Sequence, residues 1–230
     1  LIRDMNIAFE HFKKGELDMF NLREPEFWHI KAKYLLPVEQ GYMNKIVYYN
    51  EKPRPSRLVS FNMSKKPLDD INIRLGLAHS FNFEKLFKTL MKDDVIRQEA
   101  FADGYGEYST KAFQPRKFSP QKAGKYFENA GYTKRDKDGI RIKDGKRLEF
   151  KLLYINEADT PKMILIKEEA KKAGVAFELD NYDSNTVFVS MLDKKHQIAW
   201  HGWSPGFRPR YWGGYHSDNA DKNKTTNFSN

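Results

Sequence analysis

The sequence predicts an α/β fold with a largely parallel sheet segment, and the last third of the chain provides most of the evidence. Residues 148–155 alternate apolar and polar side chains, which is typical of a strand with one buried face. The last third of the chain follows the order strand–helix–strand–helix–strand, which implies right-handed crossovers and parallel pairing. The elements that follow the first strand are expected at 160–174 (helix), 175–179 (strand), 185–192 (helix) and 197–201 (strand).

The first part of the chain predicts shorter elements. Apolar residues at helical spacing indicate a helix within 5–20 that Gly15 can end, and residues 17–20 then fit a short strand. A second strand is expected at 45–49. Two prolines within 51–55 stiffen the connection that follows and remove backbone donors, which suits a crossing between two lobes.

The middle of the chain carries clear helix start signals. A strand at 57–62 runs into a corner where Asp69 or Asp70 can cap a helix, because a carboxylate accepts hydrogen bonds from the free amides of a first turn. Asn82 can cap the next helix, whose apolar residues fall at i, i+3, i+4, i+7 and i+8. Ser119 precedes a proline and is expected to start a third helix.

Composition limits the classes of function. The 230 residues carry 40 Lys and Arg against 31 Asp and Glu, a formal net charge of +9, but the basic residues are scattered among acids as on a solvated surface. We therefore expect no nucleic-acid partner. The absence of cysteine excludes disulfides, thiolate metal sites and a cysteine nucleophile. No apolar run approaches the ~20 residues that a membrane span needs.

The loop that leaves the last predicted strand is the leading candidate for a binding site. Ligands of open α/β sheets bind beyond the carboxyl ends of the strands, and residues 201–207 follow such an end. Aromatic residues are frequent from Trp200 to Tyr215, and flat, rigid side chains make good cleft walls. They could equally belong to the core or cover a neighbouring lobe. Trp203 is the strongest single candidate because it lies just past the strand end.

Other chemistries find weaker support in the sequence. The six histidines match no zinc-ligand spacing, so we expect no metal site, and we expect no cofactor. The Gly-x-Gly of 104–106 has no strand before it and fits a turn better than an anion cradle. A hydrolase that uses His201 and Ser204 is an open alternative, although no Gly-x-Ser-x-Gly elbow occurs and no sequence feature gives Ser204 a base.

Four patches of the chain, in order, carry a resemblance to a known family. The second patch, 61–82, has five residues in register with that family: Asn62, Pro67, Asp69, Asp70 and Arg74. At its end, Asn82 replaces an acid that the family usually has. The sequence resembles the family 5 extracellular solute-binding proteins, the peptide and nickel receptors of bacterial ABC importers, and is most similar to the branch that takes up peptides and peptide antibiotics such as microcin C. The patches are 8–18, 61–82, 118–132, and 200–203 with 215–217.

The resemblance implies a periplasmic-binding-protein-like lobe of type II with a mixed, partly parallel sheet flanked by helices. It assigns 1–55 to the tail of lobe I and its crossing strands, and 56–230 to most of the second ligand-binding lobe, in a chain truncated at both ends. It also implies a monomeric, periplasmic receptor that is not an enzyme. Such a receptor captures a peptide or peptide-like solute between two lobes and delivers it to an ABC permease in the inner membrane.

One departure from the family concerns the candidate loop. Oligopeptide receptors of the family carry an aspartate three residues after the tryptophan, where it binds the amino terminus of the peptide, and this chain has Gly206 there. Arg208 nearby favours an anionic group instead. The expected ligand-binding residues are Asn62, His201, Trp203, Ser204, Gly206, Phe207 and Arg208.

Overall fold

The computed structural model describes residues 2, 4–22, 24–53, 56–99, 103–110, 112–203, 206, 208 and 210–229. Its α-helices are α1 (Met5–Lys13), α2 (Leu36–Glu39), α3 (Ile71–Ser80), α4 (Phe83–Thr89), α5 (Pro120–Asn129), α6 (Thr160–Lys171), α7 (Ser184–Leu192) and α8 (Trp212–Tyr215). Its strands are β1 (Ser56–Phe61), β2 (Lys134–Arg135), β3 (Arg141–Lys143), β4 (Lys146–Arg147), β5 (Glu149–Tyr154), β6 (Ala176–Asn181) and β7 (Ile198–Trp203). The short helical segments are η1 (Phe27–Lys31), η2 (Gly106–Tyr108), η3 (Glu157–Asp159) and η4 (Ser217–Asn219).

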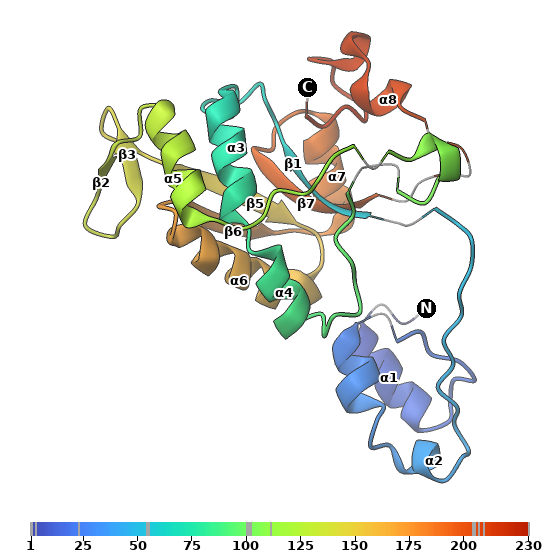
Figure 1. Ribbon diagram of the computed structural model, residues 1–230. Helices are drawn as coiled ribbons and strands as arrows, with labels where there is room; N and C mark the ends of the chain where they lie inside the picture. The colour runs from blue at the N-terminus through green and yellow to red at the C-terminus, as the bar shows by residue number, and fades with distance from the viewer. Residues whose placement is uncertain are drawn as a thin grey trace.

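A four-stranded mixed sheet lies at the centre of the larger part of the molecule, with the strand order β1-β7-β5-β6 (Figure 1). Strand β5 pairs in parallel with both β6 and β7, whereas β1 runs antiparallel to β7. The predicted α/β fold with a partly parallel sheet is therefore confirmed. A separate antiparallel sheet of β2, β3 and β4 is built from two tight hairpins.

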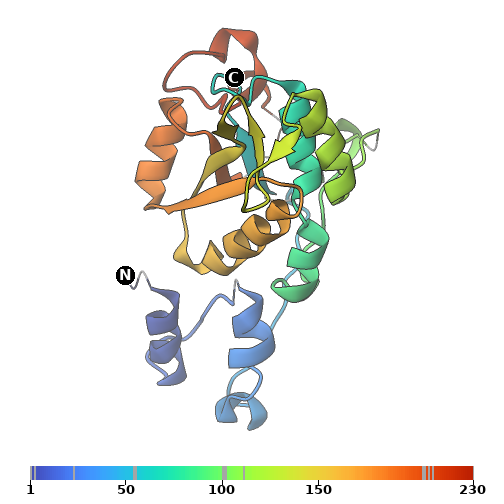
Figure 2. The ribbon, with the colours of Figure 1, turned by 90° about the vertical axis from the view of Figure 1, so that its left-hand side faces the viewer.

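The two faces of the main sheet are covered by different helices. Leu152 and Tyr154 of β5 belong to a large core that also contains residues of α3, α4, α5 and α6, whereas Leu153 packs with Val187 and Met191 of α7. Figure 2 shows α7 (orange) on one side of the sheet and α3 (teal) on the other. Because the chain passes from β5 to β6 and then returns across β5 to β7, its direction across the sheet reverses between β5 and β7.

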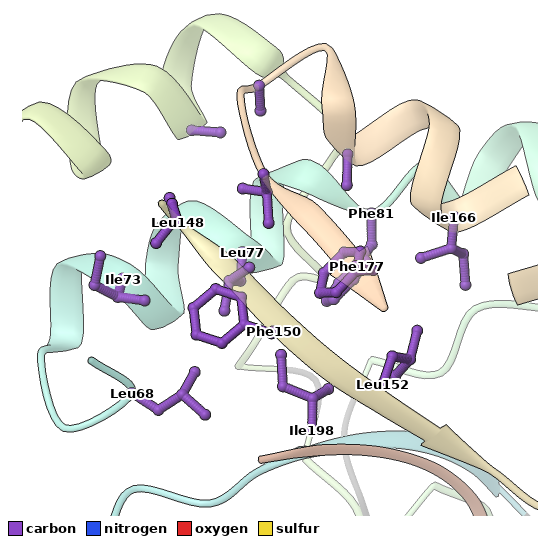
Figure 3. Close-up of a cluster of buried hydrophobic side chains, with 14 of the residues drawn as sticks. Leu68, Ile73, Leu77, Phe81, Leu148, Phe150, Leu152, Ile166, Phe177 and Ile198 are labelled. Carbon is purple, nitrogen blue, oxygen red and sulfur yellow. The ribbon is translucent and has the colours of Figure 1, made fainter. Parts of the chain in front are cut away.

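The large core is apolar and closely packed. Figure 3 shows the rings of Phe150 and Phe177, from neighbouring strands, close to Leu77 of α3. Helices α3 and α5 approach each other at Gly76, where an added Cβ would lie 2.3 Å from Cε1 of Phe127. The glycine is therefore required by the close approach of the Phe127 ring.

The expected helix starts are confirmed. Asp70 accepts a hydrogen bond from the amide of Asn72 at 2.8 Å and caps α3. Asn82 accepts one from the amide of Lys85 at 3.0 Å and caps α4, and Ser119 caps α5 in the same way. Each side chain satisfies an amide that the first turn of its helix leaves without a partner.

The described residues up to Pro53 form a small body, here called the N-terminal unit. Phe9 and Phe27 lie at its buried centre, with their rings edge to face and 5.1 Å apart. Gly15, at φ +76°, follows the end of α1 as expected. Figure 1 shows the helices of this unit to one side of the main sheet, and the residues after α2 form a long extended stretch toward β1.

Two strands expected in this unit are wrong. Residues 17–20 and 45–49 belong to no strand. A strand needs a neighbour for its backbone donors and acceptors, and the described residues offer none to either segment. Tyr48 and Tyr49 are 76% and 92% exposed. The assignment of 1–55 to a first lobe and 56–230 to a second stays a prediction.

No helix among the described residues is both long and apolar enough to cross a membrane.

Candidate ligand-binding site

The candidate site lies at the carboxyl ends of β5 and β7, where the chain direction across the sheet reverses; we call this position the switch point. Open α/β sheets bind ligands outside such a point. Asp159, which follows β5, lies here against β7, because Nε1 of Trp200 donates to Oδ2 of Asp159 at 3.2 Å. The side chain of Asp159 is only 2% exposed. The switch point therefore contains a buried carboxylate.

Lys162 connects this carboxylate to the N-terminal unit. Its Nζ donates to Oδ1 of Asp159 at 2.7 Å and to Oε2 of Glu24 at 2.9 Å. The side chains of Lys162 and Glu24 are 10% and 18% exposed, so the ammonium is largely removed from water and needs both carboxylates. A second bridge joins Nε2 of His29 to Oδ2 of Asp94 at 2.8 Å. The N-terminal unit thus contacts the larger part beside the switch point.

Asp159, Lys162, Glu24 and Arg57 form the charged group of the switch point. Arg57 is its exposed member. The pairing of β1 with β7 puts it opposite Gly202, and its Nη1 lies 3.5 Å from Oδ2 of Asp159. Its side chain is 51% exposed. Asp159 also accepts hydrogen bonds from Lys162 and Trp200, so Arg57 is its third cationic or polar neighbour and the only exposed one of the three.

An aromatic stack adjoins the charged group. The ring of Phe83, at the start of α4, stacks on Trp200 with 6.1 Å between centroids. The guanidinium of Arg97 lies 4.5 Å from the centroid of Phe83. Burial lowers the pKa of Arg97 and the nearby charge of Glu84 opposes this effect, but an arginine stays protonated at physiological pH. Trp200 is 5% exposed and belongs, with Phe83 packed against it, to the large core, so this stack supports the switch point from inside the protein.

Several of the expected ligand-binding residues lie at or after the end of β7. Trp203, the last residue of the strand, is partly buried and packs against the small core beneath α7. The carbonyl oxygen of Gly206 accepts a hydrogen bond from the hydroxyl of Tyr105 at 2.7 Å, so the loop is tied to the 104–106 segment, a turn as expected. Arg208 is exposed. Ser204 and Phe207 lie outside the described residues.

His201 and Asn62 are buried and make their contacts inside the protein. His201 Nδ1 donates to the carbonyl oxygen of Gly202 at 3.2 Å, which leaves Nε2 to accept from the hydroxyl of Ser60 at 2.8 Å. Burial lowers the pKa of His201. Both ring nitrogens are therefore occupied on the inner side, which gives no support to a hydrolase with His201 as base. Asn62 follows the opposite end of β1, where its amide donates to two backbone carbonyls that precede β7.

The surface also has a hollow of about 220 Å³ at the amino ends of β5 and β6. Its wall includes Arg147, which pairs with Asp138 at 3.2 Å and lies 3.8 Å from Glu149. This hollow is at the end of the sheet away from the switch point, so topology and not hollow size locates the candidate site. In the part of the chain that the structure describes, no group of three or more His, Asp or Glu side chains is placed to hold a metal ion.

Sequence reasoning missed the buried charged group. The rule that points to the loop after β7 applies equally to the residues after β5, and it would have identified Asp159. The contact between Glu24 and Lys162 joins residues 138 positions apart, and no local pattern announces it. The exposure of Arg57 depends on its having a glycine opposite in the sheet, which is visible only once the strands are paired.

A mixed sheet of this topology, with a second unit beside its carboxyl edge, is the architecture of a periplasmic binding protein lobe. Two solved structures have this fold over 99% of the chain. The oligopeptide-binding protein AppA from Bacillus subtilis, in complex with a nonapeptide, has a TM-score of 0.82 at 20% identity, and 44% of its chain is covered. NikZ from Campylobacter jejuni, in complex with Ni(L-His), has a TM-score of 0.75 at 22% identity, and again 44% is covered.

The chain belongs to the family 5 bacterial extracellular solute-binding proteins. The model described as "Bacterial extracellular solute-binding proteins, family 5 Middle" matches residues 1–224, which confirms the resemblance. A probable ABC transporter-binding protein of Deinococcus radiodurans is 26% identical over 85% of the chain and 34% of its own length. The nickel-binding periplasmic protein of Escherichia coli is 22% identical over 86% of the chain and 37% of its own length. The chain thus spans about a third of these curated relatives.

Proposed function

We propose that this chain captures a peptide or peptide-like solute as part of the substrate-binding component of an ABC importer. The component delivers its solute to a permease in the inner membrane and performs no covalent chemistry. The observation that carries this proposal is the contact between Glu24 of the N-terminal unit and Lys162 beside the switch point. It brings a second body to the strand edge where α/β sheets bind ligands, as a two-lobed receptor requires.

The proposed solute lies between the carboxyl edge of the sheet and the first lobe, to which we assign residues 1–55. Trp203 contributes an aromatic wall, and the loop with Gly206 and Arg208 contributes backbone groups and a cation. Ser204 and Phe207 belong to the same loop. His201 and Asn62 contribute indirectly, because their hydrogen bonds hold β7 and the segment before it in position.

A peptide is favoured over a metal chelate, although the fold accommodates both: AppA was solved with a nonapeptide and NikZ with Ni(L-His). Trp203, the partly buried aromatic residue at the end of β7, suits an apolar side chain of a peptide. The periplasm is the proposed location, in keeping with the name of the nickel-binding periplasmic relative. We propose that the receptor acts as a monomer, because a cleft between two lobes of one chain needs no second copy.

Thermal unfolding of the complete gene product that carries these residues tests the proposal. Short peptides should raise the melting temperature, since a ligand at about 100 times its Kd adds about 2.7 kcal/mol to the free energy of unfolding. Calorimetry then measures affinity for the peptides that respond. Response to Ni(L-His) alone would reassign the solute class, and the absence of any response to peptides, sugars and metal chelates would contradict the binding function itself.

A further inference from the structure

We infer that Arg57 is the anchor for a carboxylate of the solute, so that the receptor prefers peptides with a free carboxyl terminus. The inference rests on the proposed function and names a chemical group that this site recognises. Arg57 lies at the start of β1, opposite the last residues of the antiparallel strand β7. It is therefore at the same edge of the sheet as the candidate loop.

The hydrogen bonding of the switch point leaves the guanidinium of Arg57 available. Asp159 holds it from one side, with Nη1 3.5 Å from Oδ2. The carboxylate does not depend on Arg57, because Lys162 and Trp200 donate to its two oxygens at 2.7 and 3.2 Å. Within the described part of the chain, the guanidinium of Arg57 makes no side-chain hydrogen bond, although it carries five N–H donors. Such a fork binds a carboxylate through two parallel hydrogen bonds.

The neighbouring strand leaves the guanidinium uncovered. Gly202 is the pairing partner of Arg57, and an added Cβ there would meet Nη1 of Arg57 at 4.0 Å. Any longer side chain at 202 would lie against the guanidinium and exclude water or solute from that side. The glycine thus leaves the side chain 51% exposed while Asp159 fixes its orientation.

The two acids of the charged group around Lys162 are largely buried. Glu24 and Asp159 are acids with side chains 18% and 2% exposed, and both are bound by Lys162. The exposed charges at this edge include the cations Arg57 and, on the loop after β7, Arg208, and the acid Glu157 in the segment after β5. Gly206 adds no acid to this loop. An approaching carboxylate can therefore reach the guanidinium of Arg57, while Glu24 and Asp159 are held by Lys162.

Retention of two matched peptide libraries tests the inference on the complete gene product. Both libraries contain random tetrapeptides without Asp or Glu; one has free carboxyl termini and the other is amidated, so the terminal carboxylate is the only anion that differs. Bound peptides are separated by gel filtration and counted by mass spectrometry. The wild-type receptor should retain the free acids about tenfold more than the amides, which corresponds to about 1.4 kcal/mol.

Arg57→Gln should remove that preference by lowering retention of the free acids to the level of the amides. Arg57→Lys should restore part of it, because the charge returns without the fork. Arg147→Gln, at the far end of the sheet, is the matched control and should keep the preference. Equal retention of both libraries by the wild type, or an unchanged preference in Arg57→Gln, would overturn the inference and leave the proposed function standing. If the wild type retains neither library, the proposed function fails, and the inference fails with it.

Discussion

Glu169 on α6 gives a pH-dependent contribution to stability that can be worked out from its contacts. Glu169 is 3% exposed, and its carboxylate accepts hydrogen bonds from Lys172 at 2.7 Å, Lys85 at 2.7 Å and Asn82 at 2.9 Å. Burial opposes ionisation, but these three donors outweigh it and lower the pKa of Glu169 from 4.5 to about 2. Because Asn82 also caps α4, the carboxylate joins α6 to the start of that helix.

The sign and size of the effect follow from this shift. A carboxyl group whose pKa is lower in the folded state stabilises the protein fully above the unfolded pKa, and the stabilisation is lost as pH falls from 4.5 toward 2. A shift of that size corresponds to at most about 3 kcal/mol. Lys85 and Lys172 are 49% and 55% exposed, so screening by solvent reduces the expected value to about 1–2 kcal/mol.

Urea unfolding of the wild type and Glu169→Gln measures this contribution. At pH 7 the variant should lose about 1–2 kcal/mol, and at pH 3 the difference between the two proteins should fall to less than half of that. Glu168→Gln is the matched control, because Glu168 is the exposed neighbour on the same helix, and it should change little at either pH. A loss in Glu169→Gln that is equal at both pH values would refute the reasoning.

Three further substitutions test other contacts by the same unfolding measurement. Gly76→Ala should destabilise the protein, because overpacking against Phe127 costs about 1–3 kcal/mol and outweighs a gain of about 1 kcal/mol in helix propensity; a stabilised variant would contradict the packing. Asp70→Ala should cost about 1 kcal/mol through the lost cap of α3, and no loss would remove that role. Lys162→Met should cost about 3 kcal/mol, because it leaves two carboxylates without their shared cation. That variant should also speed hydrogen exchange in the N-terminal unit, and unchanged exchange would contradict a bridging role.

The order of elements in the larger part of the molecule was predictable because its signals are local. Alternation along 148–155 identified β5, and the cap residues Asp70, Asn82 and Ser119 identified the helix starts, since each acts on amides two or three residues away. The strand expected at 45–49 shows the limit of such signals. A β-prone run becomes a strand only when another strand pairs with it, and pairing is a tertiary event.

The candidate site was predictable in location but not in its contents. The rule about carboxyl strand ends led to the loop after β7, yet it did not reveal that Asp159 and Arg57 converge on the same edge from distant parts of the chain. His201 and Asn62 are polar residues near strand ends, and their sequence gives no indication of whether they face a ligand or the interior. The pairing of β1 with β7 decides it, because it turns His201 toward Ser60 and puts Asn62 at the far end of the sheet.

The two cations beside Asp159 differ in a way that separates binding from assembly. Lys162 is 10% exposed and bridges to Glu24, so its removal should weaken the contact with the N-terminal unit whether or not solute is present. Arg57 is 51% exposed and has no partner in the N-terminal unit among the described residues, so its removal should change affinity for a carboxylate and leave the unfolding free energy nearly unchanged. Asp159→Asn should impair both, because the same carboxylate holds Lys162 inside and orients Arg57 outside. A receptor in which Asp159→Asn weakened peptide binding with no effect on the N-terminal unit would show that the buried and exposed halves of this charged group act independently.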